Sequence, residues 1–138
     1  MLVKEIMSKN IVTIDSNKSV YEAASLLREN KIGSVLAVDN EGNVGIVTKR
    51  DIIGGTILQY KNADTTPISE IMNTDVITIG PLEKIEKAVE LMEESKIKKL
   101  IVIKNKDIVG IITVTDISRA TKNITKRIED SCLNMGTD

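Results

Sequence analysis

The chain repeats itself once, and this duplication limits the folds that it can adopt. When the sequence is aligned with itself at the spacing that separates Asp51 from Asp116, roughly eighteen of the first 57 residues find an identical partner without a gap. Self-similarity at one fixed period is the signature of a duplicated structural unit. The sequence therefore predicts a first domain at 1–60, a polar linker at 61–67, a second domain at 68–123 and a partly helical tail at 124–138.

Within each repeat, the pattern of apolar residues predicts the order strand, helix, strand, strand, helix, preceded by a short helical lead-in. In the first repeat we expect a lead-in at 3–7, strands at 11–14, 34–38 and 44–48, and helices at 20–30 and 49–58. In the second repeat we expect helices at 83–95 and from 116 onward, with strands at 100–103 and 108–113. Because the strands are apolar on both faces, the predicted fold class is α/β (α+β), with two repeats packed sheet to sheet in pseudo-two-fold symmetry.

Polar residues, Gly and Pro predict where these elements begin, weaken and end. Ser16 and Ser19 are candidate caps for the helix at 20–30, and Pro67 suits the first turn of the second lead-in. The pair Gly54 and Gly55 weakens the middle of the helix at 49–58, since each Gly costs about 1 kcal/mol relative to Ala. Residues 136–138 are expected to fray.

The composition limits the functions that the chain can have. Nineteen basic and twenty acidic residues leave a formal net charge of -1, so no overall field attracts the protein to nucleic acid or to an anionic membrane. The chain has no His and a single cysteine, Cys132, so it lacks the commonest general base and a disulfide pair. We therefore predict no catalytic activity and no metal site. Without a membrane span or a signal peptide in the sequence, we expect a cytoplasmic protein.

The most informative repeated stretch lies at 45–52 and returns at 110–117, with Gly, Ile, Thr, Asp and Ile at the same spacing. Each copy is typical of a strand that runs directly into a helix. The Thr and the Asp have the spacing of a capping box, which satisfies the first N–H groups of a helix without any ligand. The same two side chains suit a nucleotide, because Thr can donate to a phosphate and Asp can accept both hydroxyl protons of a ribose. Both interpretations fit the sequence.

With this motif intact in both repeats, residues 1–120 resemble a tandem pair of CBS domains, the cystathionine beta-synthase type, also called a Bateman module. The resemblance implies a regulatory, energy-sensing type of module with no catalytic cofactor. It also implies an adenosyl ligand, such as AMP, ADP, ATP, S-adenosylmethionine or methylthioadenosine, bound in clefts between the two domains. The module would then signal to a partner protein.

The resemblance assigns ligand-binding roles to residues of the motif and of the first strands. Asp51 and Asp116 would hold the ribose, Thr48 and Thr113 the phosphate or ribose, and Ile46 and Ile111 would line the base. The first strand of the opposite repeat would complete each site, with Asn10 and Val12 contributing to the Asp116 site and Asp75 and Ile77 to the Asp51 site. Aliphatic side chains suffice to hold an adenine ring.

The family binds phosphate at positions before the second strand, and there the two repeats differ. These positions are Gly33 and Ser34 in the first repeat and Lys98 and Lys99 in the second, and Ile32 is a further nucleotide-binding candidate. Arg50 is a further candidate cation, whereas its counterpart Thr115 is neutral. The lysines also have a structural explanation, since cations at the end of a helix complement its dipole. The asymmetry predicts that the two clefts are not equal.

Self-association is expected, because the helices carry more apolar residues than one pair of domains can bury. These residues are Ile52, Ile53, Ile57, Leu58 and Ile117. Modules of the family commonly dimerise, so the resemblance implies a homodimer. The alternative function is a structural or protein-interaction module whose motifs only cap helices and bind no nucleotide.

Overall fold

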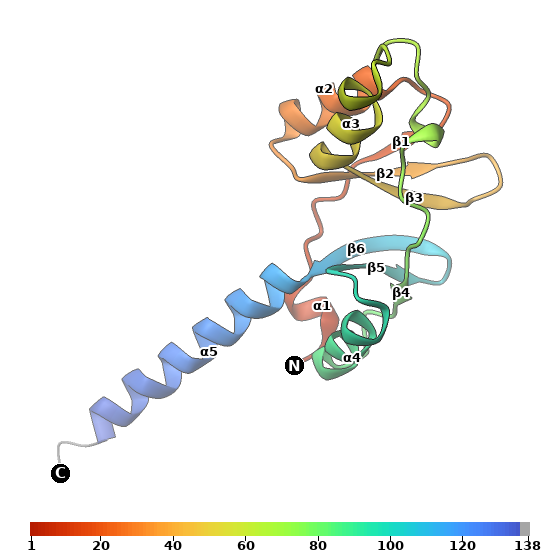
Figure 1. The fold of residues 1–138 in the computed structure, drawn as a ribbon. Helices are drawn as coiled ribbons and strands as arrows, with labels where there is room; N and C mark the ends of the chain where they lie inside the picture. The colour runs from red at the N-terminus through yellow and green to blue at the C-terminus, as the bar shows by residue number, and fades with distance from the viewer. Residues whose placement is uncertain (136–138) are drawn as a thin grey trace. The chain divides into compact units, whose positions relative to one another are not determined.

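The computed structural model describes residues 1–135, with side chains described through Cys132. The chain divides into two compact units, each built on one three-stranded sheet with helices (Figure 1). We call residues 10–76 the first-repeat unit, and residues 1–9 together with the chain from Ile77 onward the second-repeat unit. The predicted fold class, mixed α/β in two similar halves, is confirmed. The expected fraying at 136–138 lies outside the described residues.

The first-repeat unit follows the predicted order of elements with small shifts. Its elements are β1 (Thr13–Asp15), α2 (Val20–Asn30), β2 (Ser34–Val38), β3 (Val44–Thr48), α3 (Lys49–Gly55) and the 3-10 helices η1 (Ile57–Gln59) and η2 (Ile68–Glu70). The central strand β2 pairs in parallel with β1 and antiparallel with β3. Its core joins Ala23 and Leu27 of α2 to Val35, Ala37 and Val47 of the sheet, so one face of the sheet is covered by helix.

The second-repeat unit is built in the same way. Its elements are α1 (Val3–Ile6), β4 (Thr78–Ile79), α4 (Ile85–Ser95), β5 (Lys99–Lys104), β6 (Asp107–Thr113) and α5 (Val114–Met135). The strand β5 pairs in parallel with β4 and antiparallel with β6. Ala88 and Met92 of α4 pack on Leu100, Val102 and Ile112 of the sheet, again on one face.

The helix that begins at Lys49 ends at Gly55, so its predicted extension to residue 58 is wrong. Thr56 leaves the helical conformation, with φ of -122° and ψ of -69°, while its hydroxyl donates to the carbonyl oxygen of Ile52 at 2.6 Å. Ile57 and Leu58 belong instead to the separate 3-10 helix η1. The two glycines that end α3 have low helix propensity, which explains why the helix stops where it does.

The sequence predicts a partly helical tail at 124–138, whereas the described part of this segment continues the last helix without a break. α5 runs from Val114 to Met135 as one helix (Figure 1). Ile117, near its start, packs against the core of the second-repeat unit. From Thr121 to Cys132 every side chain is exposed, so the distal part of α5 takes no part in that core.

One of the two predicted caps is confirmed. Ser19 is the N-cap of α2, and its hydroxyl oxygen accepts the N–H of Glu22 at 3.2 Å. Ser16 is buried and does not cap the helix; its N–H donates to the carbonyl oxygen of Val38 at 3.0 Å. Pro67 lies one position before the predicted first turn, at the N-cap of η2.

The two short lead-ins are exchanged between the repeats. α1 precedes the first repeat in sequence, yet Val3 is fully buried in the core of the second-repeat unit and its N–H donates to the carbonyl oxygen of Glu83 at 2.8 Å. Conversely η2, which precedes the second repeat, places Ile68 in the core of the first-repeat unit. Each compact unit therefore combines one repeat with the lead-in of the other.

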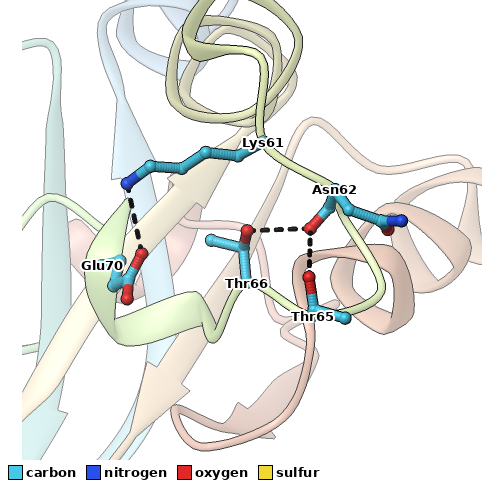
Figure 2. Close-up of polar contacts among 5 residues, drawn as sticks. All are labelled: Lys61, Asn62, Thr65, Thr66 and Glu70. Carbon is cyan, nitrogen blue, oxygen red and sulfur yellow. Dashed lines mark hydrogen bonds and ion pairs between the residues drawn. The ribbon is translucent and has the colours of Figure 1, made fainter.

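The polar linker at 61–67 is held by its own hydrogen bonds (Figure 2). The hydroxyl of Thr66 donates to the carbonyl oxygen of Asn62 at 2.8 Å, and that of Thr65 donates to the same oxygen at 3.4 Å. Lys61 forms an ion pair with Glu70 of η2 at 3.4 Å. The linker thus fixes the approach of η2 to the first-repeat unit, to which both belong.

Candidate functional site

Each repeated motif lies where the last strand of a unit runs into a helix. In the first-repeat unit the N–H of Thr48 donates to Oδ2 of Asp51 at 2.9 Å, and the N–H of Asp51 donates to the Thr48 hydroxyl at 3.3 Å. In the second-repeat unit the N–H of Thr113 donates to Oδ2 of Asp116 at 2.9 Å, and the N–H of Asp116 donates to the Thr113 hydroxyl at 3.1 Å. Both motifs therefore form the reciprocal bonds of a capping box.

The capping bonds use only part of each carboxylate. In both motifs the bonds from Thr go to Oδ2, and within the described part of the chain no hydrogen bond reaches Oδ1 of Asp51 or Asp116. An ionised carboxylate accepts at two oxygens, so each Asp retains an acceptor for a ligand. Asp51 and Asp116 are half-buried, which holds this acceptor in place without removing it from the surface. Capping and ligand binding are thus compatible.

The glycine at the start of each motif is required by the exchanged lead-in. A Cβ on Gly45 would lie 2.7 Å from Sδ of Met72, and a Cβ on Gly110 would lie 2.7 Å from Sδ of Met7 and 2.8 Å from the carbonyl oxygen of Ser8. No carbon can approach so closely without a shift of its neighbour. The glycines let each lead-in cross the strand that ends in the motif Thr.

The phosphate-binding candidates lie beside the motif in each unit. In the strand register, Ser34 pairs with Thr48, and Lys99 pairs with Thr113. The carbonyl oxygen of Lys98 accepts the N–H of Val114 at 3.0 Å, so Lys98 also lies at the strand–helix junction. At these strand positions the two Thr–Asp pairs therefore differ in charge, while Lys49 and Arg50 lie on the helix that follows Thr48.

The structure weakens the alternative explanation of these lysines. Helix α4 ends at Ser95, and its last turn contains no basic residue. Lys96 is the C-cap, whereas Lys98 follows beyond it and Lys99 opens β5. Because dipole effects fall off within the last turn of a helix, they do not account for Lys98 and Lys99.

The remaining candidates in the first-repeat unit differ in how far their side chains are exposed. Arg50 is exposed at the start of α3, next to the motif. Gly33 is exposed before β2, whereas Ile32 packs against the core of the unit, so its side chain serves the core. Ile46 and its counterpart in the second-repeat unit, Ile111, are both buried, with 9% and 8% of their surface exposed.

The first-strand candidates are placed by backbone pairing. The carbonyl oxygen of Val12 accepts the N–H of Leu36 at 2.9 Å, and that of Ile77 accepts the N–H of Ile101 at 3.0 Å. Val12 thus belongs to the same unit as Asp51, and Ile77 to the same unit as Asp116. Asn10 and Asp75 are exposed. The contributions of all four first-strand candidates to a ligand site stay predictions.

Ser8 and Asn73, which fasten each lead-in to the motif strand, are not among the residues predicted from the sequence. Ser8 and Ile111 exchange two backbone hydrogen bonds, of 2.8 and 3.0 Å, and Asn73 and Ile46 exchange two of 2.9 Å. Both pairs hold the chain just before Asn10 and Asp75, respectively. The signal in the sequence was the identical Glu-Ile-Met at 5–7 and 70–72, because this Met is what packs on the motif Gly.

The described residues show neither a cluster of metal ligands nor a helix suited to cross a membrane. Among the described residues, no three His, Cys, Asp or Glu side chains gather in a way that could hold a metal ion. None of the helices in the described region combines the length and the apolar character needed to cross a membrane.

The sequence matches the CBS domain family twice, over residues 3–55 and 68–123. It is 31% identical over 116 residues to the CBS domain-containing protein YhcV of Bacillus subtilis (strain 168), and the match covers 84% of this chain and 82% of that protein. The chain spans only 32% and 53% of the length of two other curated relatives.

Solved structures resemble this fold closely. The CBS domain pair of protein MJ0100, in complex with 5'-methylthioadenosine and S-adenosyl-L-methionine, matches with a TM-score of 0.76 and 35% identity, over 89% of this chain and 97% of that one. The hexameric CBS-CP12 protein from bloom-forming cyanobacteria matches with a TM-score of 0.76 and 29% identity, over 85% of this chain and 69% of that one. With the family matched in both copies of the internal repeat, the chain belongs to the CBS domain family and carries two CBS domains in tandem.

Proposed function

We propose that the protein is a regulatory module that binds adenosyl ligands at its two Thr–Asp motifs and signals their level to a partner protein. The observation that carries this proposal is Oδ1 of Asp51 and Asp116, which accepts no hydrogen bond from the described residues and lies beside a helix N-terminus, where a capping box occupies Oδ2. This oxygen can accept from the ribose hydroxyls. The chain has no His and a single cysteine, which favours sensing over catalysis.

The related structures support the choice of ligand. The CBS pair of MJ0100, 35% identical to this chain, was solved with methylthioadenosine and S-adenosylmethionine. We propose the same adenosyl class here. A ligand of this class presents a flat base for aliphatic side chains and a diol for a carboxylate, which the residues of each motif can supply.

We further propose that the two motifs prefer different adenosyl ligands. Lys98 and Lys99 lie beside Thr113 and favour a ligand with phosphates, such as AMP, ADP or ATP. Gly33 and Ser34 are uncharged at the equivalent places beside Thr48, which favours a ligand without phosphate, such as methylthioadenosine or S-adenosylmethionine. Arg50, which is adjacent to Asp51, is the cation that would hold a phosphate at this motif, so the proposed preference is relative rather than absolute.

Thermal unfolding with added ligand tests the proposal. A ligand bound only by the native state at 100 times its Kd stabilises the fold by about 2.7 kcal/mol, which should raise the Tm by roughly 5 °C or more. We expect such a rise with an adenosyl ligand and none with the matching guanosyl compound. The absence of any rise at millimolar concentration, with each of the adenosyl ligands named above, would contradict the proposal.

Asp→Asn variants separate ligand binding from capping. An Asn side chain keeps one acceptor oxygen for the cap, but places an NH2 donor where a ribose hydroxyl needs an acceptor. We expect Asp116→Asn to abolish the shift caused by AMP and Asp51→Asn to abolish the shift caused by methylthioadenosine, with little change of Tm in the absence of ligand. If both variants bind as the parent protein does, the motifs only cap helices and the interaction-module alternative is favoured.

We also propose that the protein self-associates and acts in the cytoplasm, where its free thiol stays reduced. In the first-repeat unit, Ile53 of α3 is 48% exposed, and Ile57 and Leu58 of η1 are 67% and 66% exposed. The predicted surplus of apolar side chains is smaller than expected, since Ile52 and Ile117 pack against the cores. The hexameric state of the CBS-CP12 relative supports self-association. Size-exclusion chromatography with light scattering should give a mass above that of one chain.

A further inference from the structure

A pocket lies in the second-repeat unit where α1, the turn before α4 and the β5–β6 hairpin come together. Met7, Pro81, Leu82 and Val109 supply its apolar wall. Its volume is about 560 Å³, which is within the range of small-molecule sites. Leu82 is 67% exposed, so part of this wall is open to a ligand. The pocket can therefore hold the apolar part of a small molecule.

Lysines from separate segments of the chain line this same pocket. Lys4 belongs to α1, Lys9 follows α1, and Lys104 is the last residue of β5. All three are exposed, and none of them forms an ion pair within residues 1–132, whose side chains are described. Glu83 is the one acidic side chain among the residues that line the pocket, so positive charge is in excess. The pocket should therefore attract an anion.

The fold of a repeat does not require these three lysines. In the internal repeat they correspond to residues without positive charge, namely Ser69, Thr74 and Asp39. Asp39 serves its own hairpin turn, because its Oδ1 accepts the N–H of Asn43 at 2.8 Å. The first-repeat unit is built in the same way and keeps its lead-in and its hairpin without a cation at any of these positions. The lysines are therefore better explained by binding than by folding.

The pocket is separate from the Thr–Asp motif of the same unit. Lys99, which pairs with Thr113, and Lys104, which pairs with Asp107, lie at opposite ends of β5. Because a strand rises about 3.3 Å per residue, these two lysines are about 17 Å apart along the strand. A ligand in this pocket is therefore additional to the adenosyl ligand proposed above.

We propose that this pocket binds a soluble phosphate monoester that carries an apolar substituent. The lysines hold the phosphate, since an ammonium group is a donor of positive charge that suits phosphate oxygens. A phosphate monoester carries close to two negative charges at neutral pH, so it gains more from several lysines than a carboxylate with one charge does. The apolar wall holds the substituent. The protein then has a second kind of ligand, independent of its Thr–Asp motifs.

Phenyl phosphate, a phosphate monoester with an apolar ring, is the probe for this pocket. We expect it to shift the amide NMR signals of Leu82 and Val109 in a saturable way, with smaller shifts at Thr113 and Asp116. Phenol, which lacks the phosphate, should bind about tenfold more weakly, and equal binding would show that the lysines take no part. Phosphatidylcholine vesicles that contain phosphatidic acid should not pellet the protein, whose net charge of -1 gives no overall attraction to them. Pelleting would assign the pocket to a lipid headgroup and overturn the proposal of a soluble ligand.

Two lysines of one hairpin provide a matched pair of variants. Lys104→Gln should weaken the binding of phenyl phosphate about tenfold, and Lys4→Gln should act in the same direction. Lys106→Gln removes the same charge from the turn of this hairpin, outside the lining of the pocket, and should weaken binding by less than about twofold. Equal effects at positions 104 and 106 would indicate general attraction of anions and overturn the proposal. The absence of a saturable shift at millimolar phenyl phosphate would overturn it too, as would shifts confined to Thr113 and Asp116, although the adenosyl proposal would survive that last result.

Discussion

At the scale of single residues, the motif combines groups with different physical roles. Thr48 and Asp51 cap a helix through one hydroxyl and one carboxylate oxygen, and the second carboxylate oxygen remains for a ligand. Gly45 has a purely steric role, because Met72 occupies the space that a Cβ would need. The same division of roles holds for the second motif, although its glycine is more tightly enclosed.

That difference leads to a prediction for the two glycines. Gly110→Ala should cost about 1–3 kcal/mol of stability, because the new Cβ meets the backbone oxygen of Ser8 as well as Met7. Gly45→Ala should cost less, since its close neighbours all belong to the flexible side chain of Met72. Urea unfolding of both variants measures the two costs. Equal costs would mean that the backbone of the lead-in moves as easily as a Met side chain.

At the scale of single elements, α3 illustrates how a distant contact limits the side chain that a helix position can hold. Gly54 and Gly55 are adjacent, but only Gly55 faces another element: a Cβ there would clash with the Ile71 side chain. A Cβ on Gly54 would have no heavy atom within 4 Å among the residues with described positions. A steric contact therefore requires glycine at position 55, whereas no contact requires it at position 54.

Alanine substitutions at the two positions should distinguish the effect of helix propensity from that of the steric contact. Gly54→Ala should raise stability by up to about 1 kcal/mol through helix propensity alone. Gly55→Ala should lower it by about 1–3 kcal/mol, because Ile71 must shift. Thermal unfolding of the matched pair reads out the sign of each change, and a stabilising Gly55→Ala would show that Ile71 adapts without cost.

The distal half of α5 should be dispensable for the fold. All side chains from Thr121 to Cys132 are exposed, and the core of the second-repeat unit includes none of them. A chain that ends at Asn123 should therefore keep its Tm within about 2 °C, while its circular dichroism loses helical signal. A fall of Tm several times larger would mean that the distal helix packs on something in solution.

At the scale of the whole molecule, the exchange of lead-ins means that the core of each repeat includes a segment that precedes the other repeat in sequence. The fully buried Val3 belongs to the core of the second-repeat unit, and the fully buried Ile68 belongs to that of the first-repeat unit. A substitution in one lead-in should therefore destabilise the sequence repeat that it does not precede.

Hydrogen exchange tests this crossed coupling. Val3→Ala should cost about 2 kcal/mol and speed amide exchange in α4, β5 and β6, which share its core, more than in β2 and β3. Ile68→Ala should cost about 3 kcal/mol and act in the reverse sense, on α2, β2 and β3. Faster exchange in the repeat adjacent in sequence would contradict the exchange of lead-ins.

Much of the fold could be predicted from local patterns. Helix α2 matches its predicted range because Ser19 caps it and its apolar residues recur at helical spacing. The hairpin of β2 and β3 also matches, since two apolar runs flank a polar turn. Other features could not be predicted from neighbouring residues. The two glycines mark a weak point of α3 but not the residue at which it ends, and the distal part of α5 has no buried face whose apolar spacing could predict a continuous helix.

For the candidate site, too, some features could be predicted from the sequence and others could not. By itself, the sequence determined the duplicated motif, the capping spacing of Thr and Asp, and the unequal charge at Gly33–Ser34 and Lys98–Lys99, because these depend on residue type and spacing alone. Only the tertiary structure decided that Oδ1 of each Asp accepts no hydrogen bond from the described residues, that Ser34 and Lys99 lie beside the motif Thr, and that each glycine receives the lead-in of the other repeat. The strand pairing and the glycine contacts join residues that are not neighbours in the chain, and such contacts follow from packing rather than from any local pattern.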